Sequence, residues 1–190
     1  MKFILASHNK NKIKEFREIL KDTKIELISL IDLNDNEEII ETGNTFLDNA
    51  LLKAKHISKK YNLPTIADDS GIEIKYLKNA PGIYSARYSS SGDLANNLKV
   101  LKELEGVTDR YARFICVIAV YYPNDEYKSF KGVWEGFIAN TIKGNNGFGY
   151  DPIFIPNGYR STVAELDENI KAKLSHRAKA LQLLKDEFII

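Results

Sequence analysis

Cysteine is nearly absent from the sequence, with one residue, Cys116, among 190. A lone cysteine cannot form a disulfide within its own chain, and we therefore expect a reducing compartment. Cys116 lies in the apolar stretch 114–118, where we expect it to be a buried, small hydrophobic residue. Chemistry that depends on a reactive thiol is not expected.

Long hydrophobic runs are also lacking, as is an excess of either charge. No run approaches the ~18 apolar residues of a membrane helix, and the N-terminal run 3–6 is too short for a signal peptide. Lys and Arg number 27 against 26 Asp and Glu, a net charge of +1. That balance gives no overall basic field of the kind that suits a duplex nucleic acid, so any anion site must be local. We expect a cytoplasmic protein that binds neither nucleic acid nor membrane.

The composition that remains is typical of a soluble globular protein, with 44% hydrophobic and 28% charged residues. A chain of this length can bury a substantial core as one domain, or as one domain with two lobes. Apolar patterning predicts strands at 2–6, 25–30, 65–67, 72–74, 113–122 and 127–138, the last two joined by a hairpin turn. It predicts helices after residue 12, from Asn44 or Thr45, from about Asp93 to Leu104, and after Ser175. In the third helix, Leu94, Leu98, Leu101 and Leu104 are predicted to face inward.

The stretch 66–72 carries the strongest chemical signal, because an apolar run ends on Asp68 and Asp69, followed by Ser70 and Gly71. Successive side chains of a strand point to opposite faces, so one aspartate can face a cleft while the other supports it. Taken alone, the same stretch is typical of a hairpin turn with solvated aspartates.

Two other stretches allow both a binding and a structural interpretation. The polar turn 7–12 lies between a strand and a helix, where helix amides meet anions, although it lacks the glycines of a Walker loop. It can equally be a capping turn, with Ser7 or Asn9 as the cap. Lys53 lies beside the apolar stripe of its helix and shares a face with Asn49, so it either serves a site or extends its amine to solvent.

The C-terminal part holds two further candidates. Glycines flank Phe148, which favours a ring projected from its loop, and Asp151 precedes a proline. His176 and Arg177 occupy the first helical turn, where the helix dipole disfavours cations. That local cost indicates either an anionic or carbonyl-bearing ligand or a structural salt bridge.

Taken together, these stretches match one family in order and over nearly the whole length. The quoted motifs are Ser7-x-Asn9-x-x-Lys12, Glu41-x-Gly43-x-x-Phe46-x-x-Asn49-Ala50-x-x-Lys53-Ala54, Ala67-Asp68-Asp69-Ser70-Gly71, Pro81-Gly82-x-Tyr84-Ser85-Ala86-Arg87, Gly147-Phe148-Gly149-Tyr150-Asp151-Pro152-x-Phe154 and Ser175-His176-Arg177. The chain resembles the inosine/xanthosine triphosphate pyrophosphatases, which hydrolyse nonstandard purine nucleoside triphosphates. Any one motif is ordinary, but six in order are highly specific.

The resemblance implies an α/β fold with an elongated mixed β-sheet flanked by helices, two lobes with an active-site cleft between them, and a homodimer. It implies Mg²⁺-dependent hydrolysis of dITP, ITP and XTP to the monophosphate and pyrophosphate. Asp69 would be the catalytic base, Asp68 its support, and Glu41 and Asp69 the metal ligands. The substrate-binding residues would be Ser7, His8, Asn9, Lys10, Asn11, Lys12, Lys53, Ser70, Phe148, Gly149, Tyr150, Asp151, Lys171, His176 and Arg177.

One departure and two alternatives accompany the resemblance. His8 stands where many relatives have glycine, which disfavours a positive φ in the phosphate turn. Glu37 and Glu38 lie in the same acidic connector as Glu41 and are rival metal ligands. A non-catalytic nucleotide-binding module and a pyrophosphatase for modified pyrimidine nucleotides are the rival functions.

Overall fold

The computed structural model describes residues 1–188, which fall into two compact units. The first unit comprises Met1–Asp69, Cys116–Lys131 and the described residues from Ala180 onward, and the second comprises Ser70–Ile115 and Gly132–Lys179. The chain passes from one unit to the other between Asp69 and Ser70. The prediction of a single domain with two lobes and a cleft between them stays a prediction.

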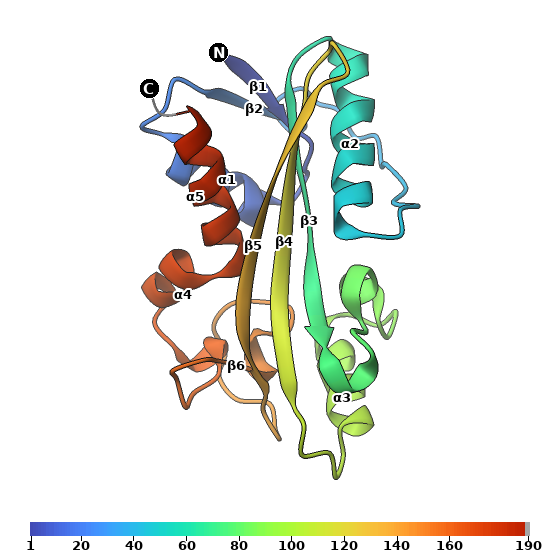
Figure 1. The fold of residues 1–190 in the computed structure, drawn as a ribbon, viewed down its shortest axis with the longest axis vertical. Helices are drawn as coiled ribbons and strands as arrows, with labels where there is room; N and C mark the ends of the chain where they lie inside the picture. Colours follow the sequence, from blue (N-terminus) through green and yellow to red (C-terminus); the bar gives the residue numbers. More distant parts are fainter. Residues whose placement is uncertain (189–190) are drawn as a thin grey trace. The chain divides into compact units, whose positions relative to one another are not determined.

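The strands form one six-stranded sheet in the order β2-β1-β3-β4-β5-β6 (Figure 1). Their bounds are β1 Lys2–Leu5, β2 Glu26–Ser29, β3 Thr65–Ile74, β4 Tyr111–Tyr121, β5 Tyr127–Ile138 and β6 Phe154–Pro156. β1 pairs in parallel with β2 and β3, whereas β5 and β6 are antiparallel. The predicted mixed sheet is confirmed.

In the first unit, helices cover both faces of the sheet (Figure 1). α1 (Lys10–Leu20) and the end of α5 (His176–Phe188) pack on one face, where Phe16 and Leu184 are buried with Cys116. α2 (Phe46–Tyr61) packs on the other face through alanines and Ile57. Thr45 and Asp48 begin α2 with a capping box. The helices predicted after residue 12 and from Asn44 or Thr45 are therefore confirmed, as is the burial of Cys116.

The second unit has its own core, in which Phe114, Trp134 and Phe154 pack edge to face. α3 (Asp93–Glu103) contributes Val100 to this core, and α4 (Glu168–Leu174) precedes α5. Short 3₁₀ helices complete the unit at Lys75–Leu77, Gly82–Arg87, Asp151–Ile153 and Val163–Glu165. Within residues 1–188, no helix is both long enough and apolar enough to cross a membrane.

Two local predictions are wrong. Ser70 and Gly71 do not form a hairpin turn, because β3 runs without a break from Thr65 to Ile74. In α3, Leu94 and Leu98 are 63% and 53% exposed, so they do not face inward. Two asparagines, Asn96 and Asn97, occupy the buried face of that helix in their place.

Candidate active site

Strand alternation places Asp68 and Asp69 on opposite faces of β3. Ile66 belongs to the core cluster under α1, and Ala67 belongs to the cluster under α2. Continuing that alternation, Asp68 faces α1 and Asp69 faces α2. Both aspartates are buried. Because a buried carboxylate is costly unless it is paired, the partners of each indicate its role.

Asp68 is held by lysines from two helices. Lys12 of α1 contacts both carboxylate oxygens of Asp68, with Nζ 3.1 Å from Oδ1 and 2.9 Å from Oδ2. Lys53 of α2 donates from Nζ to the backbone oxygen of Asp68 at 2.7 Å. Lys12 and Lys53 therefore both contact Asp68, which is compatible with its predicted supporting role.

Asp69 is oriented by a short chain of hydrogen bonds from α2. Asn49 donates from Nδ2 to Asp69 Oδ2 at 3.0 Å and accepts from the backbone N of Gly43 at 2.8 Å. A Cβ at Gly43 would lie 2.5 Å from the Cβ of Asp48, so the close approach needs glycine. Burial raises the pKa of Asp69, against the opposing effects of Lys53 and of the Asn49 hydrogen bond.

Asn49 is thus a site residue that the predicted set omitted. The signal was present in the sequence, because Asn49 and Lys53 are four residues apart and share one helix face. Its partner could not be read from the sequence, since Asp69 is 20 residues away along the chain.

Lys53 is a buried ion-pair partner rather than a solvent-reaching lysine, since its side chain is only 15% exposed. It donates to Glu41 as well as to the Asp68 backbone. Burial alone would lower the pKa of Lys53, but the charges of Asp68 and Glu41 outweigh it and hold the pKa above its ordinary value. The interpretation as a lysine that extends its amine to solvent is wrong.

Among the connector carboxylates, Glu41 is the one that lies with Lys53. Glu37 instead pairs with His56 and Lys60 on the outer surface of α2. The described residues contain no group of three or more His, Cys, Asp or Glu side chains able to hold a metal. Two carboxylates still suit Mg²⁺, because it prefers oxygen and usually keeps several waters alongside one or two protein ligands.

The turn 7–12 is a helix cap, as its structural interpretation predicted. Asn9 is the N-cap of α1 and accepts through Oδ1 from the backbone N of Asn11 and of Lys12. Ser7 accepts from the backbone N of Asn9 at 3.2 Å, and His8 donates from Nε2 to the backbone oxygen of Asp35 at 2.6 Å. His8 therefore ties this turn to the acidic connector.

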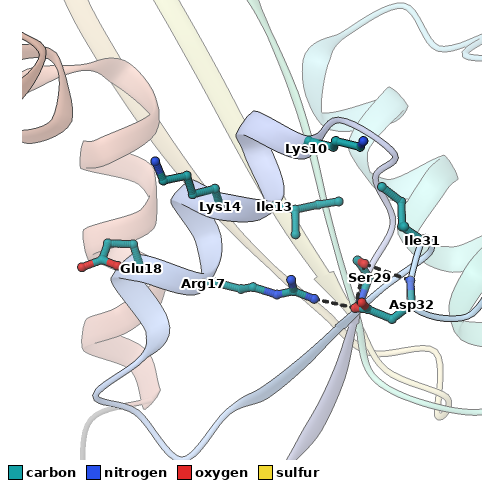
Figure 2. Close-up of a pocket in the computed structure, with 8 residues that line it drawn as sticks. All are labelled: Lys10, Ile13, Lys14, Arg17, Glu18, Ser29, Ile31 and Asp32. Atoms are coloured by element: carbon teal, nitrogen blue, oxygen red, sulfur yellow. Dashed lines mark hydrogen bonds and ion pairs between the residues drawn. The ribbon is translucent and has the colours of Figure 1, made fainter.

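Lys10 lies apart from the carboxylates that Lys12 contacts. Figure 2 shows Lys10, Lys14 and Arg17 along α1, lining a pocket of about 400 Å³ in which Arg17 pairs with Asp32. Lys12, the other predicted lysine in the turn, contacts Asp68.

In the second unit, Phe148 presents its ring from a tightly bonded loop. Phe148 is 41% exposed, and Lys171 Nζ lies 4.1 Å from the centroid of its ring. Asp151 accepts from the backbone N of Phe148 at 3.0 Å and from Lys171 Nζ. Burial raises the pKa of Asp151, although Lys171 opposes this. Phe148, Asp151 and Lys171 are thus brought together as predicted.

The start of α5 brings together three more predicted residues. The ring of His176 stacks on Phe114, with centroids 4.7 Å apart and planes at 11°. Arg177 donates from Nη2 to Ser70 Oγ at 3.3 Å, and Ser175 caps the helix by accepting from the backbone N of Ala178. The predicted cap is confirmed, and Arg177 contacts Ser70 of β3.

The polar groups of Tyr150 and Gly149 form hydrogen bonds to neighbouring segments of the second unit. The Tyr150 hydroxyl donates to the backbone oxygen of Ser85 at 2.6 Å. Gly149 has a φ of +62° and bonds through its backbone to Asp93 and Asn97 of α3. Neither α3 residue was predicted as part of a site.

Known proteins are similar in sequence to this chain over nearly its whole length. The dITP/XTP pyrophosphatase of Oceanobacillus iheyensis is 50% identical over 188 residues, covering 96% of this chain and 95% of that protein. The enzyme of the same name from Bacillus subtilis is 48% identical over 185 residues, covering 95% and 93%. The solved structure of a HAM1 protein from Coxiella burnetii has a TM-score of 0.93 and 43% identity, covering 98% of both chains.

A model that describes a whole protein family also matches this chain, over residues 3–187. That range contains all six sequence motifs together with the carboxylates, lysines and loops described above. The resemblance inferred from the motifs is confirmed. With this coverage and identity, the chain belongs to the Ham1 family.

Proposed function

We propose that the protein is a nucleoside-triphosphate pyrophosphatase that hydrolyses dITP, ITP and XTP to the monophosphate and pyrophosphate with Mg²⁺. The observation that carries the proposal is the cluster formed by the buried carboxylates of β3 with Lys12 of α1 and Lys53 of α2, in which Asp69 is oriented by Asn49. Relatives with 50% and 48% identity bear the name dITP/XTP pyrophosphatase. We further propose that it acts on the cytoplasmic nucleotide pool.

Lys12 and Lys53 are the groups that would hold the triphosphate. A triphosphate carries nearly four negative charges, and two lysines can offset part of them without an overall basic protein. Both amines contact Asp68 in the structure. When the substrate binds, its phosphate oxygens would take hydrogen bonds from these amines, while Glu41 and Asp69 would be the metal ligands. Bound Mg²⁺ would supply charge neutralisation and a more acidic water.

Asp69 would accept the proton of the attacking water. Burial raises its pKa, which makes the carboxylate a better base than one in water. Asn49 holds one oxygen, Oδ2, at 3.0 Å, so the direction of the carboxylate is fixed before substrate arrives. Direct attack of water on phosphorus needs no covalent intermediate, in keeping with a buried Cys116.

The residues of the second unit would recognise the base. Phe148 offers an exposed ring for stacking, and Arg177, His176 and Lys171 supply donors. A 6-oxo purine accepts hydrogen bonds at the position where adenine presents an amino donor. Arg177 can only donate, so an adenine there would leave a buried donor unpaired.

Replacing Arg177 is expected to weaken this discrimination. Because an unpaired buried donor costs about 1–3 kcal/mol, Arg177→Ala should reduce the ratio of kcat/KM for ITP over ATP by about tenfold or more. The measurement is pyrophosphate release from both nucleotides under matched conditions. An unchanged ratio would remove Arg177 from base reading.

Replacing Phe148 tests the stacking role, and the chain offers a matched control. Phe148→Leu should raise the KM for dITP about tenfold, because base stacking on an aromatic ring contributes about 1–3 kcal/mol. Phe137→Leu changes another exposed phenylalanine of the second unit, 49% exposed, and should leave KM unaltered. Equal effects of the two substitutions would count against a base contact at Phe148.

One assay separates the rival functions. Pyrophosphate release is measured from ITP, XTP, dITP, GTP, ATP and a modified dUTP, with and without Mg²⁺. The proposal expects Mg²⁺-dependent release from the first three. Binding without release would instead indicate a nucleotide-binding module, and preference for the modified dUTP would indicate a pyrimidine pyrophosphatase.

The resemblance also implies a homodimer, which we retain as a proposal. Sedimentation velocity across a range of protein concentrations is the direct measurement. A single monomeric species at micromolar concentration would contradict it.

A further inference from the structure

Both backbone polar groups of Gly149 are held by one face of α3. The Gly149 N donates to Asp93 Oδ2 at 2.8 Å, and Asn97 Nδ2 donates to the Gly149 oxygen at 3.0 Å. Asp93 and Asn97 are four residues apart and so lie one above the other on the helix. α3 therefore holds Gly149 through hydrogen bonds to both its backbone N–H and its backbone oxygen.

The burial of Asn97 indicates that its hydrogen bond to the Gly149 backbone is structurally important. Asn97 lies on the inner face of α3 with 2% of its surface exposed, a place where an apolar residue would normally pack. Burying an amide is unfavourable unless it forms hydrogen bonds. Among the described residues its Oδ1 has no hydrogen-bond partner, so the bond from Nδ2 to Gly149 is the one that offsets the burial.

The backbone of Phe148 is also held by a hydrogen bond. The backbone N of Phe148 donates to Asp151, and the next residue, Gly149, has a φ of +62° that only glycine adopts easily. The backbone on both sides of the ring is thus fixed, while the ring itself stays 41% exposed. A group already fixed in its binding position loses less conformational entropy when a ligand arrives.

We propose that Asp93 and Asn97 are positioning residues for the nucleobase, which act by fixing the Gly149 peptide so that Phe148 presents its ring. This inference rests on the proposed function, in which Phe148 contacts the base. It assigns to α3, which carries none of the predicted site residues, a role in substrate affinity.

The test compares Asp93→Ala, Asp93→Asn and Asn97→Ala in two assays. The first measures KM and kcat for dITP, and the second measures inhibition of that reaction by inorganic tripolyphosphate, which has no base. Asp93→Ala and Asn97→Ala should raise the KM for dITP about tenfold while kcat and the tripolyphosphate inhibition constant stay within about twofold. Asp93→Asn keeps an oxygen acceptor for the Gly149 N and should restore most of the affinity.

A charge-matched control comes from the far end of the same helix. Glu103→Ala removes a carboxylate that bonds to the Tyr88 hydroxyl and should leave the KM for dITP unaltered. Hydrogen exchange at the Gly149 amide should accelerate in Asp93→Ala and stay slow in Glu103→Ala. An unchanged KM in both alanine variants, or equal changes for dITP and tripolyphosphate, would overturn the inference.

The two proposals fail in different ways. A wild-type protein that releases no pyrophosphate from dITP overturns the proposed function and the base-positioning role with it. An active wild type whose KM for dITP is raised by Phe148→Leu but not by Asp93→Ala or Asn97→Ala overturns the positioning role alone.

Discussion

Replacing Asp69 with asparagine is expected to reduce pyrophosphate release from dITP by about a thousandfold or more. A general base contributes about 10²–10⁴ to a rate, and the asparagine amide oxygen cannot take a proton at neutral pH. If Asp69 is a metal ligand, as proposed, the same substitution would also replace a charged ligand by a neutral one. Single-turnover release of pyrophosphate at saturating dITP and Mg²⁺ is the measurement. Activity within tenfold of wild type would contradict the assignment of Asp69 as base and ligand.

The same variant should fold at least as stably as the wild type. The folded-state pKa of Asp69 is raised by burial, so its charge destabilises the fold above that pKa. As the pH falls through the raised pKa towards the ordinary value of 3.8, the wild type becomes protonated and this cost disappears. Asp69→Asn should therefore be the more stable protein at pH 8, and its advantage should be smaller at pH 5.

Asp32 provides a control in which the expected change in folding stability has the opposite sign. Hydrogen bonds from Ser29 lower the pKa of Asp32, so its charge stabilises the fold at neutral pH, and that contribution is lost as the pH falls through the lowered pKa. Asp32→Asn should thus lose stability at pH 8, by an amount reduced by its solvent exposure. Urea unfolding at the two pH values measures both variants. A large loss of stability in Asp69→Asn at both would attribute its inactivity to misfolding.

The fold could be predicted well wherever local periodicity and packing agree. α1 and α2 carry their apolar residues at helical spacing, and those residues are buried. α3 breaks the agreement, because its inner face holds two asparagines: Asn96 bonds to the preceding segment at Ser89, and Asn97 bonds to Gly149, 52 residues away. An apolar pattern cannot reveal that a polar residue will find hydrogen bonds in the folded chain, and so Leu94 and Leu98 were given the wrong orientation, whereas Leu101 and Leu104 do face the core.

β3 shows the same limit for backbone conformation. Asp, Ser and Gly favour turns locally, yet the segment stays extended since it lies between β1 and β4 in the sheet. Strand alternation was a better guide than turn propensity, because it correctly divided Asp68 from Asp69 once the strand was known to continue. Pairing within the sheet determined the extended conformation of this segment. Strand alternation then determined the face of β3 on which each aspartate side chain lies.

The sequence could predict which residues belong to the candidate site, but not which of them contact one another. The motifs gathered most of the residues that the structure brings together in each unit. They could not say that Lys53 pairs with Glu41 or that Asn49 orients Asp69, because these bonds join residues 12 and 20 positions apart. Their roles in binding and catalysis stay proposals.

Lys53→Met is expected to be the most destabilising single substitution among the site residues. Lys53 is the cation that contacts Glu41 and the Asp68 backbone, and its charge also acts on Asp69. Its removal leaves the carboxylates of Asp68, Asp69 and Glu41 close together without the charge of Lys53, while Lys12 still contacts Asp68. Breaking a buried ion pair from one side costs about 3–5 kcal/mol, or a fall in Tm of roughly 6–20 °C for a chain of this size. Activity with dITP should fall at least a hundredfold.

Lys59→Met on the same helix is the matched control. Lys59 pairs with Asp125 at the surface, where an ion pair contributes about 0–1 kcal/mol, so its Tm should change little. Calorimetric scans of both variants give the comparison, and equal losses would contradict a special role for Lys53.

A double variant separates charge from packing as the cause. If repulsion among carboxylates destabilises Lys53→Met, then adding Glu41→Gln removes one of the charges and should recover part of the lost Tm. If the loss came from the packing of the longer lysine stem, the two substitutions would add. Mg²⁺ makes the distinction clearer, because under the proposed metal site it would take the place of the missing cation between Glu41 and Asp69. It should raise the Tm of Lys53→Met more than that of the wild type, and this extra shift should vanish in the double variant.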